Sequence, residues 1–307
     1  MTSNGRRDGL TFAPPIKKET MKNASYPPID TAELQRFLAE DMPEGDITTE
    51  AIVGPQQRAQ GELLAKAPLV LAGIETFGAV FRLLDSGAEI DADAADGEEI
   101  APGRVLVRVR ALARSLLAGE RTALNLVQRM SGIATMTRRF VHAVEGTGAS
   151  ILDTRKTMPG LRALDKYAVR VGGGRNHRLN LSHAVLIKEN HIRMAGGVDA
   201  ALMAVAPLRG HAAWIEIEVT NQKELRSALE LAPNVILLDN MTPELTAESV
   251  RLVRQHNSGR AILTEASGGI TLANVRQYAE AGVDWISVGA LTHSTPSVDL
   301  SFEIEPE

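Results

Sequence analysis

Residues 153–191 carry the side chains best suited to chemistry, and most of them are cationic. The whole chain has a formal net charge of -5, yet this segment holds eight Arg and Lys against three Asp and Glu. Three glycines (172–174) interrupt it, and His177, His183 and His191 lie within it. Arginine offers a two-pronged donor, and glycine lets the backbone approach a ligand closely. The segment therefore favours binding of small anions such as phosphates and carboxylates.

Part of this charge has a simpler interpretation. Residues 161–170, LRALDKYAVR, place apolar side chains at helical spacing with charges between them. We therefore interpret Arg162 and Lys166 as charges on a solvated helix face. The sequences DTRK, NHR and IKENH each abut an apolar segment that is typical of a buried strand, so we interpret their charges as functional.

After Gly146, short apolar runs rich in Val and Ile alternate with helical patterns. This alternation predicts parallel strands wrapped by helices. An α/β barrel is favoured over an open doubly wound sheet, because no glycine-rich dinucleotide fingerprint follows the first strand and polar residues recur at strand ends. Barrel active sites form at the carboxyl ends of the strands. The polar groups found there are Thr154–Lys156, Lys188–His191, Glu216, Glu218, Asp239–Asn240, Glu265, Ser267–Gly269 and Gly289–Ala290.

These residues divide by charge. Glu218 and Asp239 are acceptors suited to sugar hydroxyls or to Mg²⁺. Backbone N–H groups at 267–269 and 288–290 can bind a phosphate. The pattern predicts a site for a phosphosugar with Mg²⁺ beside a second, carboxylate-bearing substrate. The donors suited to its anionic groups are Arg155, Lys156, His177, Arg178 and Lys188.

Composition narrows the function classes. The net charge of -5 and the scarcity of aromatic residues, 4%, argue against nucleic-acid or membrane binding. The chain has no cysteine, which excludes disulfides and thiolate chemistry and fits the cytoplasm. No apolar run is long enough for a membrane span, and no signal-peptide pattern is present.

A length of 307 residues allows two domains. Residues 1–28 are predicted to be a disordered extension, because they offer little apolar surface. A mixed α/β domain is predicted over 29–131, joined by the tail 293–307, and the barrel over 132–292. Within the helical region 113–146, Ser131 and Gly132 are predicted to break the helix and mark the domain boundary. Residues 88–111 are predicted to form a hairpin that serves as scaffold.

The sequence resembles the quinolinate phosphoribosyltransferases, the decarboxylating nicotinate-nucleotide pyrophosphorylases, over about residues 34–304. The resemblance rests on eight motifs in the family's order. They are AEDMPEGDITTEAI, LLAGERTALNLVQRMSGIAT, ILDTRKTMPGLRALDKYAVRVGGGRNHR, LIKENHI, IEVTN, ILLDNM, EASGGIT and ISVGALTHS.

The resemblance implies a fold, a reaction and an assembly. The fold is an N-terminal α/β open-face sandwich joined to an incomplete α/β barrel. The reaction joins quinolinate to phosphoribosyl pyrophosphate with Mg²⁺ and releases nicotinate mononucleotide, pyrophosphate and CO₂, a step of NAD biosynthesis. The implied assembly is a homodimer, with a hexamer as a larger alternative.

The resemblance also implies roles. Arg121 would reach into the neighbouring subunit's site. Lys156 and Lys188 would face pyrophosphate, and Glu218 and Asp239 would serve the ribose and Mg²⁺. Thr154 would belong to the substrate-binding residues. The implied clamp for the quinolinate carboxylates is Arg155, His177, Arg178 and Lys188, and the implied 5-phosphate loops are Ser267, Gly268 and Gly269, and Val288, Gly289 and Ala290.

Two departures and two alternatives accompany this interpretation. His183 stands where the family often has an acidic residue, and we interpret it as a peripheral turn or core histidine. Glu189 replaces an Asp and keeps its charge.

A sister group associated with molybdenum transport, acting on another aromatic acid, is the alternative enzyme, but it resembles this chain less well around Arg121 and Lys188. A non-enzymatic anion-binding protein would not explain Glu218 and Asp239.

Overall fold

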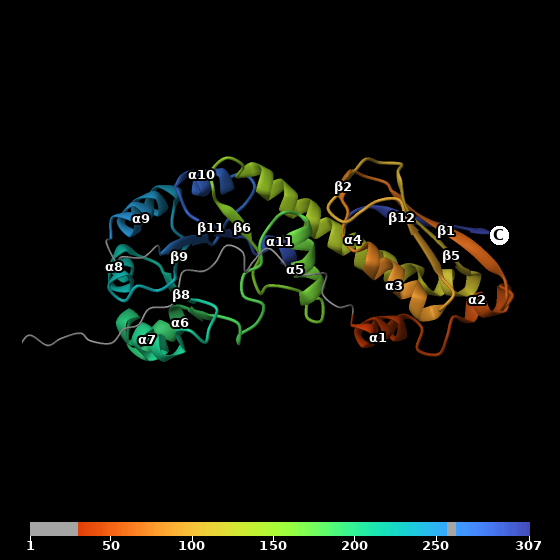
Figure 1. Cartoon of the computed structure of the whole chain (residues 1–307), viewed down its shortest axis with the longest axis horizontal. Coiled ribbons are helices and arrows are strands. Elements are labelled where there is room, and N and C mark those ends of the chain that lie inside the picture. Colours follow the sequence, from red (N-terminus) through yellow and green to blue (C-terminus); the bar gives the residue numbers. More distant parts are fainter. Residues whose placement is uncertain (1–29, 257–261) are drawn as a thin grey trace, which may run out of the picture. The chain divides into compact units, whose positions relative to one another are not determined.

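The computed structural model describes residues 30–256 and 262–307 (Figure 1). The predicted extension 1–28 lies outside the described residues. The chain forms two compact units. Of the described residues, the α4 unit comprises 30–145, 151–177 and 288–307, and the parallel-strand unit comprises 146–150 and 178–287.

The α4 unit contains a four-stranded antiparallel sheet in the order β12-β1-β5-β3. The strands are β12 (Leu300–Pro306), β1 (Arg58–Ala65), β5 (Val105–Leu112) and β3 (Glu89–Ala92). The C-terminal tail thus supplies the strand that pairs with β1. Gly61 is needed in β1, because a Cβ atom there would lie 2.1 Å from the Phe302 ring.

The α4 unit also contains the helices α1 (Thr31–Asp41), α2 (Ile47–Ile52), α3 (Ile74–Leu84), α4 (Ala113–Ala143) and α5 (Arg162–Val171), and the short α11 (Ala290–His293) near its end. Asp30 caps α1 by accepting hydrogen bonds from the N–H groups of residues 32 and 33. The rings of Phe77 and Phe81 on α3 pack against Phe302 in the core, with centroids 5.4 and 5.3 Å away. The predicted helices at 32–41 and 74–85 are confirmed, as is the turn before Ile47.

The predicted hairpin is confirmed in part. β3 and β5 pair antiparallel, but the connection between them also contributes β4 (Glu99–Ile100), which pairs with β2 (Leu69–Val70).

The predicted break at Ser131 and Gly132 is wrong, since α4 runs unbroken for 31 residues. Both residues are small because other segments approach the helix there. The Ser131 hydroxyl accepts a hydrogen bond from Ala72 N at 3.0 Å and lies 3.2 Å from Ala72 O. A Cβ at Gly132 would lie 2.3 Å from the carbonyl oxygen of Pro296. Close packing, rather than a helix end, explains the pair.

All six predicted barrel strands are present in one sheet, in the order β6-β11-β10-β9-β8-β7. Each strand lies beside its neighbour in the chain, except that the first lies beside the last. An open doubly wound sheet would not place them so, whereas a barrel does. Among the described residues β6 and β7 do not pair with each other, so the barrel is incomplete. The strands are β6 (Ser150–Leu152), β7 (Val185–Ile187), β8 (Ile215–Val219), β9 (Val235–Asp239), β10 (Leu263–Ser267) and β11 (Trp285–Ser287).

Helices follow these strands in turn, and Figure 1 shows α8 and α9 flanking β8 and β9. A cap or turn residue starts several of them; Asn221, for example, accepts from Lys223 N and Glu224 N at the start of α8. In the described residues no helix is long and apolar enough to cross a membrane. The helices of the barrel region are α6 (Glu189–Ala195), α7 (Val198–Val205), the short η2 (Ala206–Leu208), α8 (Gln222–Glu230), α9 (Pro243–Gln255), α10 (Val275–Glu280) and α11 (Ala290–His293).

Candidate active site

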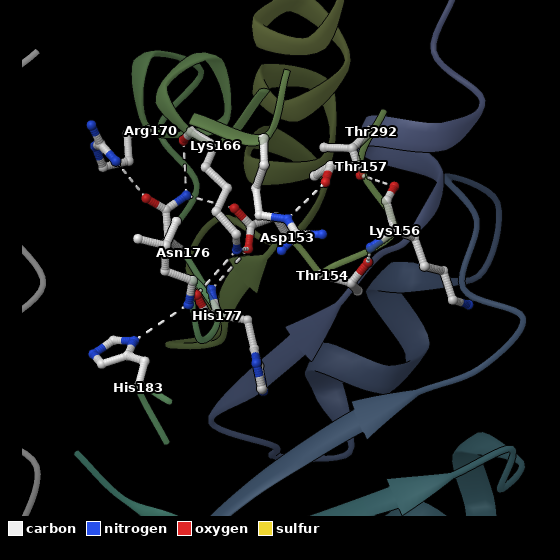
Figure 2. Close-up of polar contacts among 12 residues, drawn as sticks. Asp153, Thr154, Lys156, Thr157, Lys166, Arg170, Asn176, His177, His183 and Thr292 are labelled. Carbon is white, nitrogen blue, oxygen red and sulfur yellow. Dashed lines mark hydrogen bonds and ion pairs between the residues drawn. The ribbon is translucent and has the colours of Figure 1, made fainter. Parts of the chain in front are cut away.

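The loop that follows β6, residues 153–158, carries the predicted TRK motif and is called the cationic loop below. Its backbone is held on both sides of Lys156. Lys156 N donates to the Thr154 hydroxyl at 3.0 Å, and the Thr292 hydroxyl donates to Lys156 O at 2.8 Å (Figure 2). Val288 N donates to Leu152 O at 2.9 Å. The structure thus brings Thr154 and Lys156 together with the predicted phosphate loop 288–290.

Gly289 has little room for a side chain. A Cβ there would lie 3.1 Å from Lys156 Cδ and 3.1 Å from a ring nitrogen of His293. The backbone of Gly289 therefore lies close to the side chain of Lys156.

Arg155 lies half-buried in the same loop. Its Nε is buried and has no hydrogen-bond partner in the described part of the chain. A buried donor without a partner is unfavourable, so Arg155 is well placed to gain by binding an anion.

Asp153, at the start of the loop, is buried and forms an ion pair with Lys166. Lys166 Nζ also donates to His177 O at 3.1 Å. Lys166 is 1% exposed, so its predicted place on a solvated helix face is wrong. α5 turns its buried face, which includes Val169, inward, and Lys166 lies on that face. Arg162, one turn earlier, stays partly exposed and donates to the Thr157 hydroxyl.

Burial and charge oppose each other in this pair. Burial raises the pKa of Asp153, while Lys166 and the hydrogen bond from His177 N favour the ionised carboxylate. Burial likewise lowers the pKa of Lys166, and Asp153 counteracts it. Each residue therefore depends on the other to remain charged.

His177 joins the same network through its backbone. His177 N donates to Asp153 Oδ1 at 2.9 Å, and the preceding Asn176 donates to Asp153 Oδ2 at 2.5 Å (Figure 2). Asn176 is held in turn by Arg170, whose guanidinium donates to its Oδ1 at 2.6 Å. The α4 unit thus fixes the predicted residue His177 beside the base of the cationic loop.

A second buried carboxylate, Asp165, lies on the turn of α5 next to Lys166. It accepts two hydrogen bonds from Arg129, both at 2.8 Å, and one from Met158 N at 3.3 Å. Arg129 also donates to Thr292 O at 3.0 Å. Asp165 therefore connects α4, the end of the cationic loop and α11.

In the parallel-strand unit, four predicted residues lie at the carboxyl ends of adjacent strands: Lys188, Glu218, Asp239 and Ser267, called the strand rim below. Glu218 is in register with Leu237, two residues before Asp239, and Asp239 is in register with Ser267. Paired residues of parallel strands, and residues two apart, face the same side. Glu218, Asp239 and Ser267 therefore share one face. Lys188 Nζ reaches Glu218 at 3.2 Å.

The rim is more open to solvent than the network in the α4 unit. The Lys188 side chain is 52% exposed and that of Glu218 11%. Lys188 is also the N-cap residue of α6, and its N–H donates to His191 Nδ1 at 2.9 Å.

Gly268 shapes the rim between β9 and β10. Its φ is +95°, and a Cβ atom there would lie 2.2 Å from Asn240 Oδ1. Asn240, itself at φ +53°, donates to Asp239 Oδ2 at 2.6 Å and its N–H donates to Ser267 O at 2.9 Å. Only glycine at 268 allows this arrangement, which orients the Asp239 carboxylate.

Arg178 and His183, which follow His177 in the chain, differ in burial. Arg178 is 6% exposed, and its Nη1 donates to Ala184 O at 3.1 Å. His183 is exposed in a turn, accepts from Leu179 N at 3.3 Å and packs edge-on against the Trp214 ring. The interpretation of His183 as a turn residue is confirmed.

Arg121 lies on α4 with its side chain 61% exposed. It lines an open cavity of about 270 Å³ together with Phe37, Glu40, Asp41 and Leu161. All of these residues belong to the α4 unit.

Sequence reasoning missed Asp165, Lys166, Arg129 and Asn176. One signal was available for α5: Ala168 and Val169 follow Asp165 and Lys166 at helical spacing, which places the charged pair on the apolar face. No comparable signal marks Arg129, because its partner is 36 residues away.

Two family models match successive parts of the chain. The C-terminal domain model of quinolinate phosphoribosyl transferase matches residues 133–303, and the N-terminal domain model matches 46–131. The protein belongs to this family. A probable nicotinate-nucleotide pyrophosphorylase of Synechocystis is 42% identical over 88% of this chain and 91% of its own. The nicotinate-nucleotide pyrophosphorylase of Mycobacterium leprae is 43% identical over 88% of this chain and 95% of its own.

Solved structures agree. NadC from Streptococcus pyogenes superposes with a TM-score of 0.86 at 34% identity, covering 93% of this chain and all of its own. The predicted family and fold, an N-terminal sandwich with an incomplete α/β barrel, are confirmed. The predicted limits of the two domains, and the roles of individual site residues, stay predictions.

Proposed function

We propose that this family member is a quinolinate phosphoribosyltransferase. It transfers the phosphoribosyl group of phosphoribosyl pyrophosphate to quinolinate and releases pyrophosphate, CO₂ and nicotinate mononucleotide, a step of NAD biosynthesis. The carrying observation is the strand rim, where the cationic Lys188 and the acceptors Glu218 and Asp239 follow adjacent parallel strands. An anion-binding protein has no use for the two carboxylates. The names of the relatives support quinolinate rather than another aromatic acid.

The first chemical step breaks the bond between ribose C1 and the pyrophosphate oxygen, which leaves positive charge on the sugar. Glu218 and Asp239 stabilise that charge, since preorganised carboxylates act strongly where charge develops. Lys156 and Lys188 take up the negative charge of the leaving pyrophosphate. The pyridine nitrogen of quinolinate then bonds to C1, and no protein nucleophile is required.

The second step removes the 2-carboxylate as CO₂. Once ribosylated, the pyridine nitrogen is cationic and accepts the electron pair of the breaking C–C bond, after which a proton replaces the carboxylate on the ring. Arg155, His177, Arg178 and Lys188 are proposed to hold the two carboxylates of quinolinate. The unpartnered Nε of Arg155 supports this role.

The acidic residues of the rim fit a Mg²⁺ ion. Carboxylate oxygens are its preferred protein ligands, and Glu218 and Asp239 face the same side of neighbouring strands. These two residues are proposed to hold the ion, partly through the substrate. When bound, Mg²⁺ neutralises pyrophosphate oxygens.

The deciding experiment supplies purified protein with quinolinate, phosphoribosyl pyrophosphate and Mg²⁺ and follows CO₂ and nicotinate mononucleotide. Equal amounts of both products are expected. Nicotinate in place of quinolinate is the matched control and should give no CO₂. Turnover of nicotinate but not quinolinate would contradict the proposal.

The active assembly is proposed to be a homodimer in which Arg121 completes the neighbour's site; a hexamer would be built from such dimers. The 61% exposure of Arg121 and its place beside an open cavity support this. Subunits carrying Arg121→Ala, mixed with subunits carrying Lys188→Ala, should recover part of the activity through hybrid sites. Without recovery, Arg121 does not act across subunits.

A cytoplasmic location is part of the proposal and rests on the cysteine-free composition.

A further inference from the structure

Two adjacent charged residues of α5 are buried at opposite ends of the cationic loop. Lys166, 1% exposed, pairs with Asp153 at the beginning of the loop, and Asp165, 0% exposed, accepts from Met158 N at its end. Neither α5 residue has a role in the chemistry above. Removing charged groups from water is costly. Apolar side chains in place of buried ion pairs such as Lys166–Asp153 often give equal or greater stability.

We infer that Asp165 and Lys166 are positioning residues, which hold the cationic loop at both ends and so aim Arg155 and Lys156 at the substrate anions. The inference rests on the proposed function for the identity of those anions. It concerns geometry, because the two α5 residues act through the backbone and side chains of the loop.

The Lys166 end connects the loop to a second segment of the predicted clamp. Asp153 accepts from His177 N, and Lys166 donates to His177 O, so one ion pair holds the backbone of His177 from two directions. Figure 2 shows Lys166 and Asn176 converging on Asp153. A movement of Asp153 would therefore displace both the start of the cationic loop and His177.

The Asp165 end reaches Lys156 through two intermediates. Asp165 holds the Arg129 guanidinium with two hydrogen bonds of 2.8 Å. Arg129 donates to Thr292 O, and the Thr292 hydroxyl donates to Lys156 O at 2.8 Å. Because Lys156 N is bound to the Thr154 hydroxyl, the peptide groups on both sides of Lys156 are fixed. The orientation of Lys156 is thus set by buried charges that lie outside the loop.

The test uses the full-length protein with the double substitution Asp153→Asn and Lys166→Met, which removes both charges at nearly constant volume. The matched control is Arg114→Met. Arg114 is a half-buried residue of α4 that donates to Val53 O and Glu50 O, and in the described part of the chain it forms no hydrogen bond with the cationic loop. Affinity for inorganic pyrophosphate is measured by calorimetry, and kcat and KM are measured per folded molecule.

For the double variant, kcat/KM is expected to fall about 100-fold, the scale of a misplaced binding group, and pyrophosphate affinity to fall with it. The Arg114→Met control should lose thermal stability while its kinetic constants stay unchanged. The single variant Lys166→Arg keeps both charges of the pair, so its kcat/KM and pyrophosphate affinity should fall less than those of the double variant. Kinetic constants and pyrophosphate affinity within twofold of the control would overturn the inference.

If the double variant does not fold, Thr292→Val decides the question. It removes only the hydroxyl that holds Lys156 O, and pyrophosphate affinity should fall about fivefold, the value of one hydrogen bond. Unchanged affinity would overturn the inference. If the unmodified protein binds pyrophosphate but does not convert quinolinate, the proposed function fails, and the affinity ratios still decide the positioning role.

Discussion

The cationic loop and the strand rim both present charged side chains, but different interactions hold them. In the loop, buried ion pairs surround the functional residues: Asp153 with Lys166, and Asp165 with Arg129. In the rim, the register of parallel strands aligns Glu218 with its neighbours, and no buried ion pair is required.

Because of this difference, substitutions in the two regions should affect stability and activity to different degrees. A loop has no ladder of backbone hydrogen bonds to fix it, so its orientation depends on side chains from α4 and α5. A strand end is fixed by its sheet, so its charged side chains can stay open to solvent and to substrate. Leaving one buried charge unpaired should therefore lower stability most, whereas removing an exposed charge of the rim should lower turnover with little loss of stability.

The largest expected effect is on stability at Lys166. Lys166→Met leaves Asp153 as a buried, unpaired carboxylate, and the free energy of unfolding should fall by about 3–5 kcal/mol. Adding Asp153→Asn should recover most of that loss, because no buried charge remains. Chemical denaturation of the three proteins checks this. Equal stability of the single variant and the unmodified protein would mean that Lys166 is not buried as a charge.

At Lys188 the larger effect is expected on activity and the smaller one on stability. Lys188→Met removes a half-exposed ion pair, so the free energy of unfolding should change by less than about 1 kcal/mol. Because the cation faces the leaving group in the proposed reaction, kcat/KM should fall by about 10²–10³-fold. Steady-state kinetics and denaturation on the same preparation measure both. A large stability loss at Lys188 would remove the contrast between the two regions.

Gly268→Ala tests whether the rim depends on its backbone. The substitution forces a Cβ against Asn240 at φ +95°, which should cost about 1–3 kcal/mol of stability. Moving Asn240 also displaces the Asp239 carboxylate, so kcat should fall. The matched control is Gly103→Ala, also at positive φ but with no atom within 4 Å of the added Cβ. Equal kcat in the two variants would show that the contact with Asn240 is unimportant.

The smallest effect is expected at Thr154. Thr154→Val removes the acceptor for Lys156 N, and stability should fall by about 0.5–1.5 kcal/mol, the net value of one hydrogen bond. Pyrophosphate affinity should weaken by a few fold, since the Thr292 hydroxyl still holds the other side of Lys156. An unchanged affinity would show that the bond to Thr292 is sufficient.

Residues at strand ends were predictable from the sequence, and residues that support the loop were not. Glu218 and Asp239 each close an apolar strand pattern, which locates them on a barrel without any knowledge of contacts. Lys166 was misassigned because a charge between apolar residues of a helix is usually solvated. Ser131 and Gly132 suggested a helix end for a similar reason, whereas their small size accommodates Ala72 and Pro296.

The sequence by itself determined the family, the alternation of strands and helices, and the positions of the charged motifs, because these depend on local patterns and short spacings. Only the tertiary structure decided which charges are buried and what they hold. Arg129, Asp165 and Lys156 are brought into one network by packing of α4, α5 and α11. Burial and long-range pairing arise from the whole chain, so no short stretch of residues specifies them.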